Sequence, residues 1–243
     1  MEPRRWGLAA LSKGLGSMLF ASPCTICGAE DGPFCASCRE EMLDSGTQCA
    51  RCALSAGPWA DLKRGCSACR GRALGFDAAI ALGPYQGPIR EVCLAMKRFQ
   101  NAWVARWSAG LLIEARGDRL RDVEADLIVP VPLHWRRRLE RGYNQSDALA
   151  RALSARLGIS RGNPLVRVAS TPKLAPHGRT ERAEMMKQAF GTTRRPGVEG
   201  KTVMLVDDIL TTGATCGAAA RALKRAGAKR VFAVVLARAE GSS

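Results

Sequence analysis

Hydrophobic residues follow two kinds of pattern after residue 75. Short apolar runs without internal alternation, which are typical of strands buried on both faces, occur at 76–82, 126–133, 201–206 and 230–238. Between them, apolar residues recur at helical spacing at 89–99, 103–116, 144–158 and 216–227. Because strands alternate with helices, the pattern predicts an α/β fold with a parallel sheet that is covered on both faces.

The helix predicted at 144–158 carries the clearest end signals. Asn144 is a suitable N-cap residue, and Asp147 stands three residues later, where it completes a capping box. Gly158 suits the C-terminal stop. We therefore expect a helix that begins and ends close to these residues.

Several other residues in the helical segments have simple expected roles. Cys93 and Cys216 lie in apolar helical patterns, and we expect both to be ordinary buried cysteines. Trp103 and Trp107 are four residues apart and are expected to pack in the core or at a domain interface. For Lys97 we favour a surface position with its charge in water over one that points toward a binding site.

The first 75 residues lack these patterns and are rich in cysteine. The chain has 10 cysteines, and eight of them form the C-x-x-C pairs Cys24/Cys27, Cys35/Cys38, Cys49/Cys52 and Cys66/Cys69. Two such turns can bring four thiolates to one tetrahedral zinc ion. Metal binding would also supply the folding free energy that a segment with few large apolar residues lacks. The sequence therefore predicts two structural zinc ions.

The grouping of the cysteine pairs has two alternatives. Pairing in chain order, which we adopt, gives Cys24, Cys27, Cys35 and Cys38 for one ion and Cys49, Cys52, Cys66 and Cys69 for the other. Interleaved pairing would join the first pair to the third. A disulfide framework is a different interpretation, and it needs an oxidising compartment. No ligand position is left open, so we expect no catalysis by these ions.

The extreme N-terminus combines two arginines with an apolar tail, which raises the possibility of an export signal. Lys13 interrupts the tail, and leucines recur at helical spacing from Leu8 onward, so we favour an amphipathic helix that docks on the body. No apolar run reaches the ~18 residues of a membrane span. We expect a cytoplasmic protein with three parts: a helix at 1–20, a double zinc ribbon at 21–75, and a further domain at 76–243.

The formal net charge of +15 is concentrated in the second part of the chain. Residues 1–75 have a net charge of +2, and the remainder has +13. Such a field attracts phosphate groups, either of nucleotides or of nucleic acid. A solvated basic surface without a specific partner explains the charge equally well.

The candidate chemistry lies in the stretch VMLVDDILTTGAT at 203–215. The carboxyl ends of parallel strands are where such sheets bind ligands, and Asp207 and Asp208 come at one of them. The small residues that follow can close backbone N–H groups around a phosphate at a helix N-terminus. Two acceptors beside a phosphate cradle match the hydroxyls of a ribose 5-phosphate. The alternatives are magnesium between the acids and a diphosphate, or a helix N-cap with a spare acid.

This stretch resembles the ribose-diphosphate binding motif of type I phosphoribosyltransferases. Four further strings resemble the ComF family: VPVPLHWRRR at 129–138, RGYNQ at 141–145, AFG at 189–191 and AR at 237–238. That family joins an N-terminal zinc ribbon to a phosphoribosyltransferase-like domain and is linked to competence for DNA uptake. The similarity extends from Cys24 to Arg238.

The resemblance implies a role for each matching residue. Asp207 and Asp208 would hold the ribose hydroxyls and act in catalysis. The 5-phosphate would be held by Thr211, Thr212, Gly213, Ala214 and Thr215. The diphosphate would be bound by the turn that contains Val131 and Pro132, together with Arg138 and Arg141.

The stretch at 170–191 would be a mobile lid over the site. It departs from the family pattern at two places. Lys173 and Leu174 stand near the expected Gln, and Met185 follows Arg182 where Asn is expected.

The implied reaction transfers a phosphoribosyl group from phosphoribosyl diphosphate to an unidentified nitrogen acceptor, with Mg²⁺ accompanying the diphosphate. The alternative is a single-stranded-DNA-binding competence factor whose sugar-phosphate site is sensory or vestigial, with the competence machinery as partner. In the zinc ribbon, only Phe34 and Trp59 offer large aromatic rings for base stacking.

Overall fold

The computed structural model describes residues 23–44, 46–57, 65–98, 101–133, 139–168, 189–194 and 197–239. Its elements are, in chain order, α2 (Ala36–Leu43), β1 (Ala78–Pro84), α3 (Gly87–Ala95), α4 (Ala102–Asp122), β2 (Leu127–Pro130), α6 (Gln145–Leu157), β3 (Leu165–Arg167), β4 (Phe190–Thr192), β5 (Thr202–Leu210), α8 (Ala214–Arg225) and β6 (Arg230–Arg238). Every helix and strand predicted after residue 75 is present, and β6 has the predicted bounds, whereas the other elements have shifted ends. The helix predicted at 1–20 lies outside the described residues.

The core is a four-stranded parallel sheet in the order β1-β6-β5-β2, as the apolar runs predict. The central strands β5 and β6 are buried almost throughout. Within β5, Met204 and Val206 face one side of the sheet while Val203 and Leu205 face the other. Both faces must therefore be covered, which explains why the run does not alternate with polar residues.

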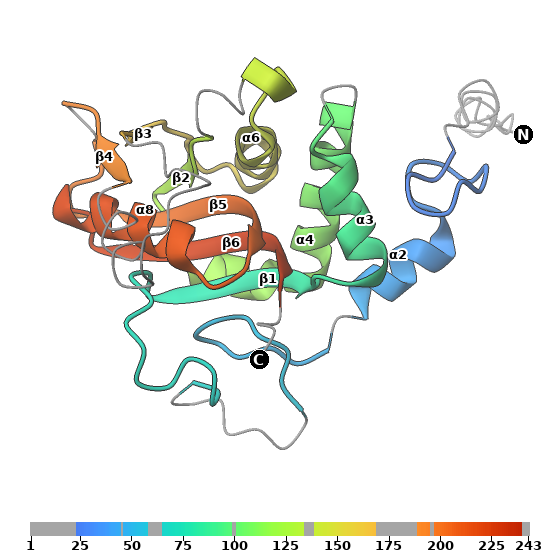
Figure 1. Cartoon of the computed structure of the whole chain (residues 1–243), viewed down its shortest axis with the longest axis horizontal. Helices are drawn as coiled ribbons and strands as arrows, with labels where there is room; N and C mark the ends of the chain where they lie inside the picture. Colours follow the sequence, from blue (N-terminus) through green and yellow to red (C-terminus); the bar gives the residue numbers. More distant parts are fainter. Residues whose placement is uncertain are drawn as a thin grey trace, which may run out of the picture.

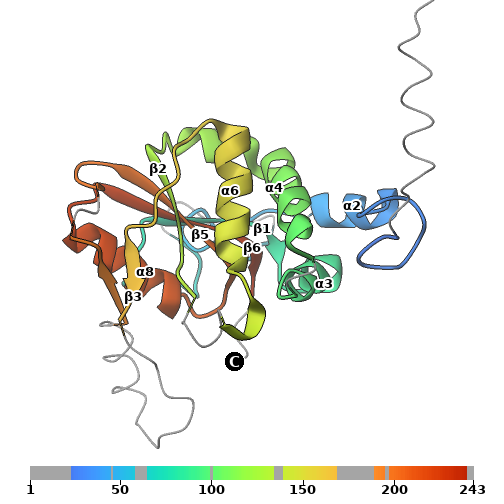
Figure 2. The same cartoon turned by 90° about the horizontal axis from the view of Figure 1, so that it is seen from above.

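Different elements cover the two faces of the sheet. The helices α3, α4 and α6 pack on one face, where Leu112, Leu149 and Leu153 are fully buried. The other face is covered by the alanine-rich face of α8 and by the separate antiparallel pair β3–β4. Figure 2 shows α6 and α4 side by side across the sheet.

Helix α6 begins and ends as its sequence predicts. The side-chain oxygen of Asn144 accepts a hydrogen bond from the Ser146 N–H at 3.1 Å, and Gly158 adopts the left-handed conformation with φ of 69°. The predicted role of Asp147 in a capping box is wrong. Its carboxylate instead pairs with Arg151 at 3.0 Å and Arg161 at 2.5 Å, because two guanidinium groups compete for it.

Strand β1 is an edge of the sheet, and side chains cover its outer carbonyl groups. Arg116 donates to the carbonyl oxygens of Ala81 and Leu82 at 3.1 Å, and Arg119 donates to that of Ala79 at 3.0 Å. Arg116 lies at a kink in α4, where its φ is −134°. The edge is thereby protected from pairing with another chain.

The two cysteine-rich segments occupy different places. The first cysteine segment (residues 23–44) ends in α2, which packs on α3 and α4 and pairs Arg39 with Glu114 at 2.5 Å. The second cysteine segment (residues 46–57 and 65–75) lies beneath β1 in Figure 1, where Gln48 donates to the Leu82 carbonyl at 3.2 Å. The protein therefore holds its two cysteine segments through separate contacts.

The prediction for the two tryptophans of α4 needs correction. Trp103 and Trp107 do not pack in the core, because they are 39% and 51% exposed on α4. The buried face of that helix is made by Val104, Ala105 and Leu112 instead. Among the described residues, no helix combines the length and the apolar character needed to cross a bilayer.

Candidate active site

The two aspartates lie near the carboxyl end of β5, opposite the N-terminus of α6. Ser146 donates its hydroxyl to Asp207 Oδ1 at 2.8 Å, and Gln145 donates its amide to Asp208 Oδ2 at 3.3 Å. The Asp208 N–H also donates to Asp207 Oδ1 at 3.0 Å. The carboxylates are only 9% and 8% exposed, so neighbouring side chains fix their orientation.

Asp207 is strongly perturbed. Burial, and then the adjacent charge of Asp208, raise its pKa to about 7, although hydrogen bonds from Ser146 and the Asp208 N–H oppose the shift. Two buried thiols flank the pair. The Sγ atom of Cys216 lies 3.8 Å from Asp207 Oδ2, and that of Cys93 lies 4.0 Å from the Asp208 carbonyl oxygen. Burial keeps the pKa of both thiols above the usual range, so they are neutral neighbours.

A cavity of about 220 Å³ opens onto both aspartates. Three cationic side chains from separate elements also line it: Lys97 after α3, Arg141 before α6, and Arg167 on β3. The cavity thus places two anionic and three cationic groups around one space. The buried Oε1 atom of Gln145 has no hydrogen-bond partner among the described residues, so this wall can accept a bond from a ligand hydroxyl.

The loop at 211–215 leads from β5 into α8. Gly213 adopts the left-handed conformation with φ of 81°, which favours glycine, and α8 begins at the next residue. Thr211, Thr212 and Ala214 are exposed, whereas Thr215 lines the cavity beside the aspartates. The first N–H groups of a helix have no partner within the helix, so the loop can bind an anion there.

The predicted diphosphate-binding turn follows β2 and also lines the cavity. The Val131 N–H donates to the Val206 carbonyl at 2.9 Å, and Asn144 donates to the Val131 carbonyl at 3.0 Å. These bonds fix the turn between β5 and the start of α6. Pro132 and Leu133 separate this cavity from a neighbouring cavity of about 430 Å³ that Tyr143 and Asp147 also line.

The structure thus brings together most of the predicted site residues. Asp207, Asp208, Thr215, the turn at 131–132 and Arg141 face one cavity. Arg138 and residues 170–188 of the predicted lid lie outside the described residues.

Several lining residues were not among the predicted site residues, including Lys97, Ser146 and Arg167. Lys97 was expected at the surface instead. Its place follows from how α3 packs beside the end of β5, which helical spacing does not show. Ser146 is the second residue after the N-cap Asn144. Its place in the first turn of the predicted helix is the one feature of the sequence that could have pointed to it.

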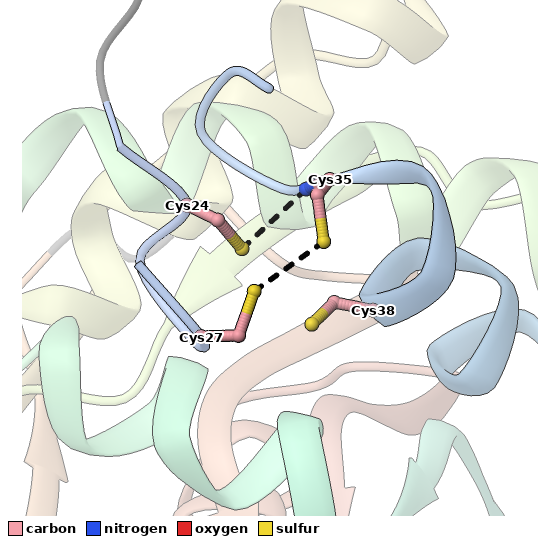
Figure 3. A group of neighbouring side chains, drawn as sticks. All are labelled: Cys24, Cys27, Cys35 and Cys38. Atoms are coloured by element: carbon pink, nitrogen blue, oxygen red, sulfur yellow. Dashed lines mark hydrogen bonds between the residues drawn. The ribbon is translucent and has the colours of Figure 1, made fainter. Parts of the chain in front are cut away.

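The first cysteine segment brings its four thiols to a common centre. Figure 3 shows Cys24, Cys27, Cys35 and Cys38 pointing toward one another. The sulfur atoms of Cys27 and Cys35 are 3.5 Å apart. All four sulfur atoms lie within 4.8 Å of one another. Tetrahedral Zn–S bonds of about 2.3 Å require sulfur atoms about 3.8 Å apart, so the donor set fits zinc.

The second cysteine segment repeats this arrangement with Cys49, Cys52, Cys66 and Cys69. The sulfur separations are 3.7 Å for Cys49 and Cys69 and 3.5 Å for Cys52 and Cys66. The Cys66 N–H donates to Cys49 Sγ at 3.3 Å, just as the Cys35 N–H donates to Cys24 Sγ at 3.4 Å. The cysteines are therefore grouped in chain order, and each group could hold one zinc ion.

Comparison with known proteins places the chain in a family. Residues 141–242 match the model of the phosphoribosyl transferase domain. Competence protein F of Haemophilus influenzae is 31% identical over 213 residues, which are 85% of this chain and 85% of that protein. The chain belongs to the ComF family. The fold is accordingly that of a type I phosphoribosyltransferase, and the two cysteine clusters fit the zinc ribbons of the ComF family.

Further relatives show the extent of the similarity. The DNA utilization protein YhgH of Escherichia coli K12 is 28% identical over 92% of both chains. Competence protein ComFC of Bacillus subtilis is 36% identical over 42% of this chain and 39% of its own. A solved glutamine phosphoribosylpyrophosphate amidotransferase of B. subtilis gives a TM-score of 0.36 at 22% identity, covering 58% of this chain and 26% of its own, too weak a likeness to bear on function.

Proposed function

We propose that the protein binds phosphoribosyl diphosphate and transfers its phosphoribosyl group to a nitrogen acceptor. The observation that carries the proposal is the single cavity that joins the acid pair, Thr215 of the 211–215 loop and three cationic side chains. Carboxylates accept hydrogen bonds from sugar hydroxyls, and cations with backbone N–H groups hold phosphates. A phosphorylated, activated pentose has both kinds of group.

The proposed ligand uses each wall of the cavity differently. Its ribose hydroxyls would donate to Asp207, Asp208 and the buried Gln145 oxygen. The 5-phosphate would lie on the loop at 211–215, at the positive end of the α8 dipole. The diphosphate would lie beside Arg141 and the turn at 131–132.

In the proposed reaction, the bond between the anomeric carbon and the diphosphate oxygen breaks, and the oxygen keeps the electron pair. The acceptor nitrogen forms the new bond to that carbon and loses a proton. Positive charge develops on the sugar ring meanwhile, as in glycoside cleavage. The carboxylates of Asp207 and Asp208 would stabilise that charge. Mg²⁺ bound with the diphosphate would supply further positive charge for the leaving group, and carboxylate oxygens are ligands that it accepts.

Calorimetry with phosphoribosyl diphosphate and Mg²⁺ tests the binding step. We expect the wild type to bind and the double variant Asp207→Ala, Asp208→Ala to show no measurable heat. Asp118→Ala is the matched control, since its side chain is 92% exposed on α4. Equal binding by the wild type and the double variant would exclude this site. Release of diphosphate in a screen of nitrogenous acceptors then identifies the acceptor.

We also propose that each cysteine cluster holds a structural zinc ion, with the ribbons at 21–75 and the transferase-like domain at 76–243. The thiol geometry supports this division. We expect two zinc ions per chain by metal analysis, falling to about one in Cys27→Ser and in Cys66→Ser. Fewer than two ions in the freshly purified wild type would contradict the two-site assignment.

A second candidate function is the binding of single-stranded DNA. The observation that favours it is the pair of exposed rings, Trp103 and Trp107, one turn apart on α4. Exposed aromatic rings beside a net charge of +15 suit base stacking and phosphate contacts. The names of the relatives, competence protein F and DNA utilization protein, agree with a role in DNA handling.

The tryptophan pair also provides the test for DNA binding. Base stacking is worth about 1–3 kcal/mol per base, so we expect Trp103→Ala with Trp107→Ala to lower affinity for an oligothymidylate by at least about tenfold. The exposed Val168→Ala is the control, because it removes apolar surface without an aromatic ring. Unchanged affinity in the tryptophan variant would exclude these rings as the binding platform.

A further inference from the structure

The second cysteine segment is joined to the phosphate-binding loop by a buried arginine. Arg238, the last residue of β6, is 9% exposed. Its Nε donates to the carbonyl oxygen of Cys52 at 3.0 Å, and its Nη1 donates to that of Leu210 at 2.9 Å. The same nitrogen contacts the carbonyl oxygen of Thr211. One guanidinium group therefore connects a predicted zinc ligand to the start of the loop at 211–215.

The backbone of the second segment also lies directly against α8. A Cβ atom on Gly217, in the first turn of α8, would lie 2.3 Å from the Leu74 carbonyl oxygen. A Cβ atom on Gly75 would lie 2.5 Å from the Gly217 carbonyl oxygen, and Gly75 has φ of +90°. Both positions therefore need glycine, because the two backbones approach too closely for any side chain.

The loop itself rests on an aromatic ring that follows the segment. The Phe76 ring is 5% exposed and lies about 3.6 Å from the Cβ position of Gly213, the residue that turns the loop into α8. Ala53, next to Cys52, is buried in the same apolar cluster as Phe76 and Leu210. The phosphate loop is thus supported from behind by the second cysteine segment. The first cysteine segment makes its contacts on α3, α4 and β1 instead.

We propose that the second cysteine cluster, acting through the positioning residue Arg238, holds the loop at 211–215 in its phosphate-binding shape. The segment has few apolar side chains, so four bound thiols must fix its backbone. If the cluster opens, the Cys52 carbonyl moves away and Arg238 loses an acceptor. The carbonyl oxygens of Leu210 and Thr211 then lose their donor, and the N–H groups of the loop lose their common orientation. The ligand side of this inference rests on the proposed function.

Hydrogen exchange of the peptide containing residues 211–217 tests the coupling without any ligand. We expect exchange there to be at least about tenfold faster in Cys66→Ser, since loss of a supporting contact opens a local unit of structure. Cys27→Ser loses the other zinc ion and is expected to leave exchange in this peptide within twofold of the wild type. Equal acceleration in both variants would overturn the proposal, because it would show general destabilisation.

Arg238→Gln provides a second test that leaves the cysteines intact. Its matched control is Arg119→Gln, which also joins the second segment to the sheet, at Ala50 and Ala79, but away from the loop. We expect Arg238→Gln to retain two zinc ions, to speed exchange at 211–217, and to weaken phosphoribosyl diphosphate binding about tenfold. We expect Arg119→Gln to change neither the exchange at 211–217 nor the binding by more than twofold.

The outcomes separate this inference from the proposed function. If the wild type does not bind phosphoribosyl diphosphate and Arg238→Gln still speeds exchange at 211–217, the proposed function fails and the coupling stands. If the wild type binds and Arg238→Gln matches Arg119→Gln in both exchange and affinity, the coupling fails and the proposed function stands.

Discussion

Replacing Asp207 by asparagine measures how much the buried charge of Asp207 lowers the free energy of unfolding. Burial, and then the charge of Asp208, raise the pKa of Asp207 from 3.8 to about 7 in the folded protein. The ionised form is therefore disfavoured by folding. Asparagine has the same shape without the charge. Its oxygen can still accept from Ser146, and its amide can donate to the Asp208 carboxylate.

The raised pKa fixes the sign and size of the effect. A group whose pKa is higher in the folded state gives its full stability below its unfolded pKa, and this contribution is lost as the pH rises through the folded pKa. With pKa values of 3.8 and about 7, the loss is roughly 1.7 kcal/mol at pH 5 and roughly 4.3 kcal/mol at pH 8, at 1.36 kcal/mol per pH unit. We expect the stability of Asp207→Asn relative to the wild type to rise by about 2.6 kcal/mol between these pH values.

Urea unfolding of both proteins at pH 5 and pH 8 is the assay. The cysteine clusters are common to the two proteins, so their own pH dependence cancels in the difference. Asp118→Asn, at a side chain that is 92% exposed, should differ from the wild type equally at both pH values. If Asp207→Asn also differs from the wild type equally at both pH values, folding does not raise the pKa of Asp207, and our account of the site is wrong.

Three further predictions follow from the site and the core. Affinity for phosphoribosyl diphosphate should rise with pH up to about 7 and then level off, because the ligand hydroxyls favour ionised Asp207; calorimetry with inorganic diphosphate as a control separates this from the ligand's own titration. Lys97→Ala should weaken that binding about tenfold, whereas Arg90→Ala, at an exposed residue earlier on α3 that pairs with Glu91, should not. Leu205→Ala, in the fully buried centre of β5, should lower the unfolding free energy by about 2–5 kcal/mol in denaturant titrations.

The sequence predicts the sheet well because its strands are buried on both faces. An unbroken apolar run such as that of β6 has few other stable environments, and its predicted range of 230–238 is confirmed. The predicted end of β5 at residue 206 is too early, since the strand continues to Leu210. The two acids interrupt the apolar run there, so the feature that marks the site also hides the last residues of the strand.

Other features depend on tertiary packing that local patterns do not contain. The strands β3 and β4 have three residues each and are far apart in the chain, too short for any periodicity. Helix α4 has two apolar faces. The face with the smaller residues around Val104 is buried in the core, and the face with Trp103 and Trp107 is exposed. The tryptophans thus become surface residues.

The carboxyl end of β5 has an energetic problem that the rest of the sheet does not share. Asp207 opposes folding because it is buried beside the charge of Asp208, and the loop that follows has only small side chains with which to pack. Under the proposed function neither feature can be removed, because the phosphorylated sugar would need both the acids and the open backbone. Stability must therefore come from outside the strand and loop. Ser146 supplies a hydrogen bond from α6, and Arg238 on β6 donates to the carbonyl oxygens of Leu210, at the end of β5, and Thr211, at the start of the loop. On this account the second cysteine segment stabilises the part of the proposed binding site that contributes least to its own stability, the loop at 211–215.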